Sequence, residues 1–423
     1  MSAAKPFEQL MQLPAAVRQY LLITFNYWSF TLTDGALRML VVLHFHQLGY
    51  SPLAIAMLFL FYEIFGVVTN LLGGYLGARL GLNRTMNLGL GMQVFALAML
   101  LVPAASLPLW LAGVPWVMAA QALSGVAKDL NKMSAKSAIK LLVPKGEQGK
   151  LYQWVALLTG SKNALKGAGF FLGGMLLALF GFELAIAIMA SLLGLVWLLS
   201  VVMLKKDLGK AKNKPKFTEI FSKSRSVNIL SAARLFLFAA RDVWFVVALP
   251  VYLASKFAWD HWAVGGFLAV WVIGYGIVQA LAPKITGNQH QGLGVGAAPD
   301  GRSALIWASL LAFVPALIAC AMQFSFYPEA SLLLGLMLFG ALFAVNSSLH
   351  SYLIVSYSSE DAVSLDVGFY YMANAMGRLV GTVLSGLVYQ AYGLAACLWI
   401  SSIFIGITAV ISIKLPRQVV GKD

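Results

Sequence analysis

Hydrophobic runs about as long as a bilayer is thick recur along the whole chain. Polar residues separate twelve such runs, and about 20 apolar residues in helical form span a membrane. Backbone amides find no water inside hydrocarbon, so each run is predicted to be an α-helix. The alternating pattern of membrane β-barrel strands is absent from the sequence. The predicted spans are 18–44, 53–78, 85–107, 114–140, 151–180, 183–204, 228–255, 262–284, 303–326, 330–355, 364–391 and 393–414.

The composition supports an all-α integral membrane protein. Of 423 residues, 60% are hydrophobic and only 11% are charged, whereas soluble domains carry roughly a quarter charged residues. The first 20 residues are polar and amphipathic, so we expect no cleavable signal peptide. Cys320 and Cys397 both lie in apolar runs, which argues against a disulfide or a thiol metal site.

The basic residues of the loops lie almost entirely on one side of the membrane, which sets the predicted orientation. With a cytoplasmic N-terminus, the outer loops hold only Lys256. This asymmetry predicts cytoplasmic N- and C-termini. The inner segments hold the basic run 205–225 and Lys5, Arg18, Arg79, Arg84, Lys140, Lys145, Lys150, Lys284, Arg302, Lys414, Arg417 and Lys422.

The basic run also divides the chain near its middle. We predict a six-helix bundle over residues 1–204, a cytoplasmic linker over 205–227 and a second six-helix bundle over 228–423. A lipid or regulatory contact is the alternative interpretation of the linker's charge.

The two predicted bundles resemble each other in sequence. The segment "GVVTNLLGGYLG", from Gly66, matches "GIVQALAPKITG", from Gly276. A second match aligns Gly169, Gly174, Gly181 and Lys166 with Gly381, Gly386, Gly393 and Arg378. A parallel repeat of six helices is the architecture of major facilitator transporters, so the chain resembles that superfamily.

The segment "GGYLGARLGLNR" also resembles the superfamily's signature loop. Gly74, Arg79, Gly81 and Arg84 fit the pattern, but Ala78 stands where the acidic residue is usual. The gating salt bridge that this acid makes in relatives is therefore not expected here.

Nine basic residues fall inside the predicted spans. Each costs about 2.5–3.5 kcal/mol at the bilayer centre, so they are expected to face a watery cavity, an ion pair or a ligand. The third, sixth, ninth and twelfth spans carry no charge in their interiors, as expected for the outer helices of this fold. The nine are Arg38, Lys128, Lys132, Lys136, Lys162, Lys166, Arg234, Arg241 and Arg378.

Acidic residues inside the spans are fewer than the basic ones. Asp34 lies four residues before Arg38, and Asp129 lies three before Lys132, so both can pair along one helix face. Asp242 adjoins Arg241, and Glu63 is the other acid near mid-membrane. The residual cation surplus predicts an anionic substrate, because unpaired buried cations are costly. Asp34, Glu63, Asp129 and Asp242 are candidates for proton coupling or ion pairing.

The planar guanidinium of arginine can donate two parallel hydrogen bonds to phosphate or its analogues, and the ammonium of lysine adds a compact positive charge. Alternatives stay open for several residues. Arg38 can be a structural partner of Asp34, Arg234 can be interfacial, and Lys136 and Lys140 can extend toward the interface. The predicted substrate-binding residues are Arg38, Lys128, Lys132, Lys162, Lys166, Arg241, Arg378 and Asn374.

Other polar residues inside the spans have two interpretations. Asn26, Asn163, Asn346 and Asn374 either orient a substrate or hold helices together. Trp28, Trp244, Tyr370 and Tyr371 line a cavity or pack in the core, and His350 is a weaker candidate for carrying a proton.

The sequence lacks the motifs of several other protein classes. It has no Ser/His/Asp grouping, zinc-ligand spacing or phosphate-binding glycine loop. We therefore expect neither an enzyme, nor a metal or other cofactor, nor an ATP-driven pump. The basic residues follow membrane topology, so we expect a monomer in a lipid bilayer and no nucleic-acid partner. A drug–proton antiporter would need an acidic cavity, and a non-transporting sensor would not need charged inner helices.

Four sequence blocks resemble the organoarsenical efflux permease family ArsJ: "NYWSFTLTDGALRMLVVLHFHQLGYSP", "ALSGVAKDLNKMSAKSAIKLLVP", "LTGSKNALKG" and "SAARLFLFAARDVWFVVALP". The resemblance implies export of 1-arseno-3-phosphoglycerate from the bacterial cytoplasm and hence arsenate resistance. It also implies a functional partnership with the glyceraldehyde-3-phosphate dehydrogenase that makes this compound. The alternative is an organophosphate carrier or exchanger of the same superfamily.

Overall fold

A computed structural model describes residues 14–49, 58, 60–103, 106–108, 110, 113–144, 146–204, 224–259, 261–286, 299–360 and 363–417. Within these ranges the chain is helical and forms no strand, which confirms the all-α prediction. Most of the basic linker, together with Lys5, Lys145 and Lys422, lies outside the described residues. The helices are α2 (Ala15–Gln47), α4 (Leu60–Leu80), α5 (Leu82–Met99), α6 (Val114–Leu142), α7 (Gln148–Met203), α8 (Arg225–Phe245), α9 (Ala248–Lys256), α10 (His261–Ile285), α11 (Gly301–Gln323), α12 (Pro328–Tyr357) and α13 (Val363–Ser412).

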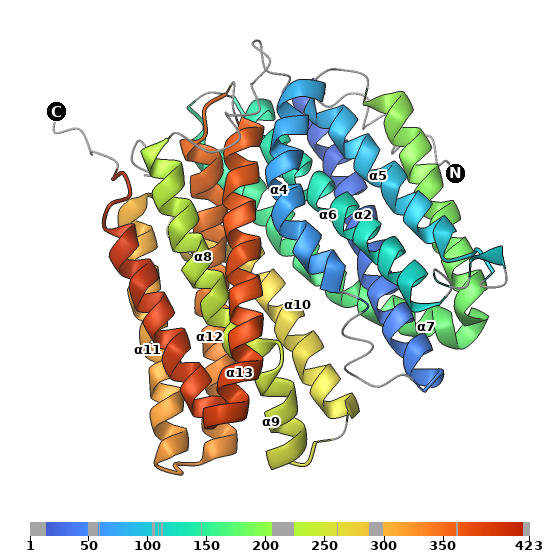
Figure 1. The fold of residues 1–423 in the computed structure, drawn as a ribbon. Coiled ribbons are helices and arrows are strands. Elements are labelled where there is room, and N and C mark those ends of the chain that lie inside the picture. The colour runs from blue at the N-terminus through green and yellow to red at the C-terminus, as the bar shows by residue number, and fades with distance from the viewer. Residues whose placement is uncertain are drawn as a thin grey trace, which may run out of the picture. The chain divides into compact units, whose positions relative to one another are not determined.

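Two of these helices, α7 and α13, are each long enough for two membrane crossings. They contain 56 and 50 residues, whereas about 20 residues cross a bilayer. Each bends once, at Gly181 (φ 71°) and at Gly393 (φ 77°), where a side chain would disfavour the left-handed backbone. The bends are visible in Figure 1. They confirm the predicted breaks between the fifth and sixth spans and between the eleventh and twelfth.

The predicted span 228–255 is interrupted in the structure. Helix α8 ends at Phe245 and α9 begins at Ala248. The hydroxyl of Ser385, on α13, accepts hydrogen bonds from the backbone N–H of Val247 (3.3 Å) and of Ala248 (3.0 Å). Because the first amides of a helix have no partner within it, this distant hydroxyl stabilises the break.

Helix length and hydropathy agree with a protein that crosses the membrane several times. Six helical segments in the described ranges are long and apolar enough to span a membrane. Two of the six are the bent helices α7 and α13. The others are Arg225–Leu253, Gly266–Ile285, Gly301–Gln323 and Pro328–Tyr357.

The chain folds into two compact units. The first comprises Met1–Leu151, Ala168–Ile220 and Ser359–Gly368, and the second comprises Tyr152–Gly167, Phe221–Ser358 and Phe369–Asp423. The predicted bundle boundaries stay a prediction, because residues 205–223 are not described.

Each unit has its own packed interior. In the first, α5 lies against α6 (Figure 1). In the second, the buried indole of Trp244 meets Trp271 and Phe339 edge to face, with ring centroids 5.9 and 5.0 Å apart. Aromatic pairs of this geometry stabilise a core beyond their area burial. Trp244 therefore packs in the core, one of the two interpretations that the sequence allowed.

Candidate functional site

The phenol ring of Tyr62 is the centre of a charged cluster in the first unit. Its hydroxyl donates to both carboxylate oxygens of Asp34, at 2.8 and 3.1 Å. The Arg38 guanidinium lies 4.8 Å from the ring centroid and the Lys128 ammonium lies 3.7 Å from it. Both cations are within the range of cation–π attraction. Helices α2, α4 and α6 thus bring three of the predicted residues together around one ring.

An ion pair lies on α6, where Asp129 directly follows Lys128 of this cluster. The Lys132 ammonium contacts Asp129 Oδ1 at 2.6 Å, and the Asp129 side chain is only 1% exposed. This confirms that Asp129 and Lys132 pair as their spacing predicted. The other oxygen of Asp129 faces Gly66 on α4, where an added Cβ would lie 3.1 Å away. Gly66 therefore leaves room for a carboxylate between two packed helices.

Two further predictions concern α6 and α4. Lys136 is 2% exposed and thus enclosed by protein, while Lys140 is half-buried. Burial of Lys136 contradicts the alternative in which it extends toward the membrane interface. Glu63 belongs to α4, but its side chain lies outside the described residues.

In the second unit, Asp242 lies between two arginines. Its Oδ1 accepts from Arg241 Nε at 2.6 Å and lies 2.5 Å from Arg241 Nη2. Its Oδ2 accepts from Arg378 Nε at 3.3 Å. The approach of α13 is possible because Gly381 has no side chain, since a Cβ there would lie 2.9 Å from that of Asp242. Arg378, which has no acid near it in sequence, thus shares the carboxylate of another helix.

A chain of neutral polar groups surrounds Arg234 in the same unit. The Asn163 amide donates to Gln279 (2.7 Å), and the Gln279 amide donates to the hydroxyl of Ser347 (3.1 Å). Arg234 Nη1 donates to the same hydroxyl at 3.1 Å, and Arg234 Nε donates to Asn374 Oδ1 at 2.9 Å. Arg234 is 3% exposed, so the interpretation as an interfacial residue is wrong.

The four asparagines therefore divide into two pairs. Asn163 and Asn374 belong to the chain around Arg234. Asn26 donates to the hydroxyl of Ser200 at 2.7 Å, and Asn346 donates to the carbonyl of Trp307 at 2.9 Å. The second pair holds helices together, because each amide bonds to a different helix.

The predicted lysines of α7 belong to the second unit. Lys162 and Lys166 lie in the segment Tyr152–Gly167, are partly buried and flank Asn163. Of the eight predicted substrate-binding residues, the first unit holds Arg38, Lys128 and Lys132. The second holds Lys162, Lys166, Arg241, Arg378 and Asn374.

The signature-like loop has ordinary local contacts. Arg79 Nη1 donates to the Tyr75 hydroxyl one turn earlier, at 2.6 Å. Ala78, at the position usual for an acid, is buried.

Two participants were not predicted as site residues. Tyr62 lies beside Glu63 in an apolar span, so a hydroxyl-bearing aromatic next to a rare mid-membrane acid was the available signal. Gln279 was hidden because its neighbours in sequence are apolar.

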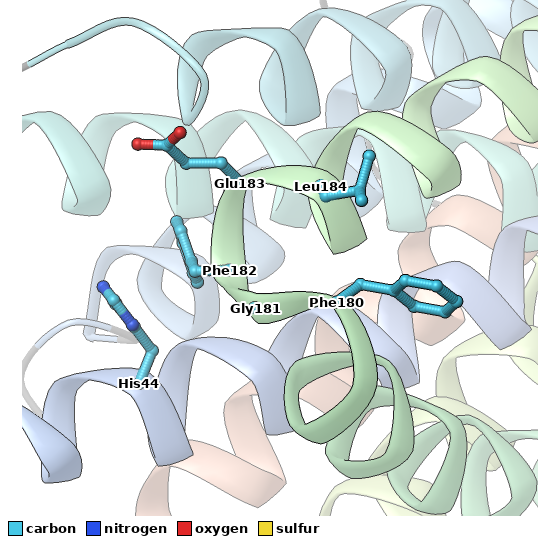
Figure 2. Close-up of a pocket in the computed structure, with 6 residues that line it drawn as sticks. All are labelled: His44, Phe180, Gly181, Phe182, Glu183 and Leu184. Atoms are coloured by element: carbon cyan, nitrogen blue, oxygen red, sulfur yellow. The ribbon is translucent and has the colours of Figure 1, made fainter.

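A hollow at the Gly181 bend lies on the first unit and involves none of the predicted site residues. Its volume is about 430 Å³, and it is lined by His44 and by residues 180–184. Figure 2 shows the His44 ring beside that of Phe182; the two stack with centroids 4.1 Å apart.

Comparison with known proteins agrees with the all-helical architecture. One solved structure similar to this chain is a bacterial homologue of the iron transporter ferroportin in an outward-facing state. It has a TM-score of 0.75 and 17% identity, covering 93% of this chain and 98% of that one. The human organic anion transporter TETRAN gives 0.72 and 18%, covering 95% and 100%. The fucose:proton symporter of E. coli, in its outward conformation, gives 0.69 and 12%, covering 95% and 99%.

No curated protein sequence gives a significant match. The family model described as Major Facilitator Superfamily matches residues 20–298, more than half of the sequence. Proteins of this fold are transporters that cross the membrane several times. The chain therefore belongs to the Major Facilitator Superfamily of membrane transporters.

Proposed function

We propose that this transporter exports an anionic organoarsenical, 1-arseno-3-phosphoglycerate, across the bacterial inner membrane and so confers arsenate resistance. The observation that supports an anionic substrate best is the environment of three arginines in the second unit. Arg241 and Arg378 share the single carboxylate of Asp242, and Arg234 contacts only neutral groups. Three guanidinium charges thus face one carboxylate charge in these contacts.

The first unit adds to this excess. Arg38, Lys128 and Lys132 are cations, whereas Asp34 and Asp129 are the acids that the described contacts place with them. Cations inside a membrane protein are costly unless a charge or solvent compensates them. A substrate that carries a phosphate and an acyl arsenate has roughly three negative charges near neutral pH, since the second pKa of such groups is about 6.

The resemblance of four sequence blocks to the ArsJ family supports the choice of substrate and the outward direction. In this proposal a glyceraldehyde-3-phosphate dehydrogenase supplies the substrate by using arsenate in place of phosphate. The compound decays outside into arsenate and 3-phosphoglycerate, so its gradient favours exit.

An organophosphate carrier is the second candidate, because the same cations would hold two phosphates. The two candidates differ in one respect: only the exporter depends on arsenate and on the dehydrogenase.

The test uses an arsenate-sensitive bacterial host that expresses the dehydrogenase with or without this chain. We expect the chain to restore growth in arsenate and to lower cellular arsenic, measured by mass spectrometry. Arg241→Gln and Arg378→Gln should each remove a charge-assisted contact of about 1.5–3 kcal/mol, which corresponds to roughly 10- to 150-fold in affinity. Arg225→Gln is the matched control, because Arg225 is an exposed arginine at the start of the same helix as Arg241.

Two results would contradict the proposal. If both arginine variants retain full resistance at equal expression, these cations do not bind the exported anion. If the wild-type chain gives no resistance but membrane vesicles take up 3-phosphoglycerate without arsenate, the organophosphate carrier is the correct function.

A further inference from the structure

The guanidinium of Arg234 is buried among neutral partners in the second unit. Nε donates to Asn374, and Nη1 donates to the carbonyl and hydroxyl of Ser347 at 3.3 and 3.1 Å. One face of the group lies 3.9 Å from the ring centroid of Phe238. Within the described residues, no ion pair joins Arg234 to a carboxylate, and these hydrogen bonds use Nε and Nη1 but not Nη2.

Such an arrangement fixes the guanidinium without neutralising it. A protein–protein ion pair would have supplied a counter-charge, which neutral oxygens cannot do. Asn374 accepts from Nε and Ser347 accepts from Nη1, so the planar guanidinium is fixed and the direction of Nη2 is determined before any ligand binds. Donors that are already fixed in this way lose little conformational entropy when an anion binds, which favours binding.

His350 is a second donor beside this group that the neighbouring residues leave unused. It is fully buried, and neither ring nitrogen has a hydrogen-bond partner in the described part of the chain. It lies one helical turn from Ser347 on α12, the residue whose carbonyl and hydroxyl accept from Arg234 Nη1. A neutral imidazole has one N–H donor and one acceptor nitrogen, and buried groups of this kind rarely stay unpaired.

We propose that Arg234 Nη2 and the imidazole of His350 form a binding site for a single oxyanion group, phosphate or arsenate, inside the second unit. This site rests on the proposed function in one respect: its physiological ligand is one of the two oxyanion groups of the exported substrate. Its hydrogen bonds are distinct from those of the Asp242 pair of arginines, whose charge is already half compensated, although Arg241 also lies 4.8 Å from the ring centroid of Phe238. The acceptor nitrogen of His350 can accept a hydrogen bond from the O–H of a monoprotonated oxyanion, whereas a halide ion has no proton to donate.

The experiment reads binding at the site itself. The purified full chain in detergent micelles, labelled with ¹⁵N at its 5 histidines, is titrated with inorganic phosphate in place of chloride at constant ionic strength. The His350 resonances are assigned by their absence from His350→Gln. We expect them to shift saturably with phosphate in the wild-type chain. The resonances of His44, at the surface hollow of the first unit, should stay unchanged.

Substitutions then test the role of the arginine. Arg234→Gln should raise the half-saturating phosphate concentration by at least tenfold, and Arg234→Lys, which keeps the charge but loses the fork, by a smaller factor. Arg225→Gln, with an exposed guanidinium on the same helix, should bind phosphate as the wild type does.

The proposal is overturned if His350 does not respond to phosphate, or responds equally to chloride titrated alone. It is also overturned if Arg234→Gln binds phosphate with unchanged affinity. Should Arg234→Gln fail to fold, the wild-type titration and Arg234→Lys decide. The function proposed above fails separately: phosphate binding at His350 without arsenate resistance would retain the site and refute the exporter.

Discussion

Replacing Asp242 by asparagine tests whether one carboxylate holds two arginines in place. Asp242 is 1% exposed and receives Nε and Nη2 of Arg241 at 2.6 and 2.5 Å. The contact from Arg378 is longer, 3.3 Å, and that side chain is 33% exposed, so water screens it and its share is below about 1 kcal/mol. Removing one partner of a buried pair costs about 3–5 kcal/mol. We expect Asp242→Asn to lower the free energy of unfolding by that amount.

The complementary change, Arg241→Gln, should cost less. Asp242 then keeps Arg378 as a partner, so the loss is that of one charge-assisted contact, about 1.5–3 kcal/mol. The double variant leaves no unpaired Arg241, so the cost of the double variant should fall short of the sum of the two single costs. The difference, on the order of 1–3 kcal/mol, measures the coupling.

The assay is reversible unfolding of the purified chain in mixed micelles with increasing denaturing detergent, for the wild type and the three variants. The contrary result is that Asp242→Asn lowers the free energy of unfolding no more than Arg241→Gln does, and that the two losses add within about 0.5 kcal/mol. That outcome would refute the reasoning, because the buried carboxylate would then not be coupled to Arg241.

Two further predictions concern single groups in the two units. Tyr62→Phe removes the hydroxyl that donates to the buried carboxylate of Asp34, so it should lower the free energy of unfolding by about 1–3 kcal/mol in the same assay. The control is Tyr75→Phe on the same helix, whose hydroxyl meets Arg79 at an exposed position. This change should cost less than about 0.5 kcal/mol. Gly377→Val should reduce the yield of folded protein measured by size-exclusion chromatography, because a Cβ there would clash with the backbone carbonyl of Leu235. Gly386→Val on the same helix meets nothing within 4 Å and should be tolerated.

The helices could be predicted from the sequence because their signal is local. Apolar length gives the spans, and the repeated glycines at 181 and 393 give the bends of α7 and α13. The Asp129–Lys132 ion pair could be predicted for the same reason, since a spacing of three residues along a helix brings two side chains to one face.

Contacts between helices distant in sequence could not be predicted in this way. The partner of Arg378 is on α8, and the partners of Arg234 are on α12 and α13. The break before α9 depends on a serine hydroxyl more than a hundred residues away. In each case the deciding atom belongs to another helix, and the spacing of residues along one helix does not indicate which distant helix lies beside it.

The internal repeat is visible in how glycines pack within each unit. In the first unit, a Cβ at Gly74 of α4 would lie 2.5 Å from the carbonyl oxygen of Ser364, and one at Gly368 would lie 2.7 Å from that of Asn70. Both contacts place α4, which contains the second predicted span, against the beginning of α13, which contains the eleventh.

The second unit contains the corresponding crossing, between α10 and the beginning of α7. A Cβ at Gly160 would lie 2.5 Å from the carbonyl oxygen of Gly276, and one at Gly276 would lie 2.8 Å from that of Gly160. An equivalent pair of helices thus crosses in each unit, although the sequence match does not align the glycines of one crossing with those of the other. The atoms in the way are backbone atoms, which cannot move aside as a flexible side chain can. This constraint explains why each crossing keeps a glycine on both of its helices, whereas Lys166 and Arg378, which are aligned in the sequence match, correspond only in charge.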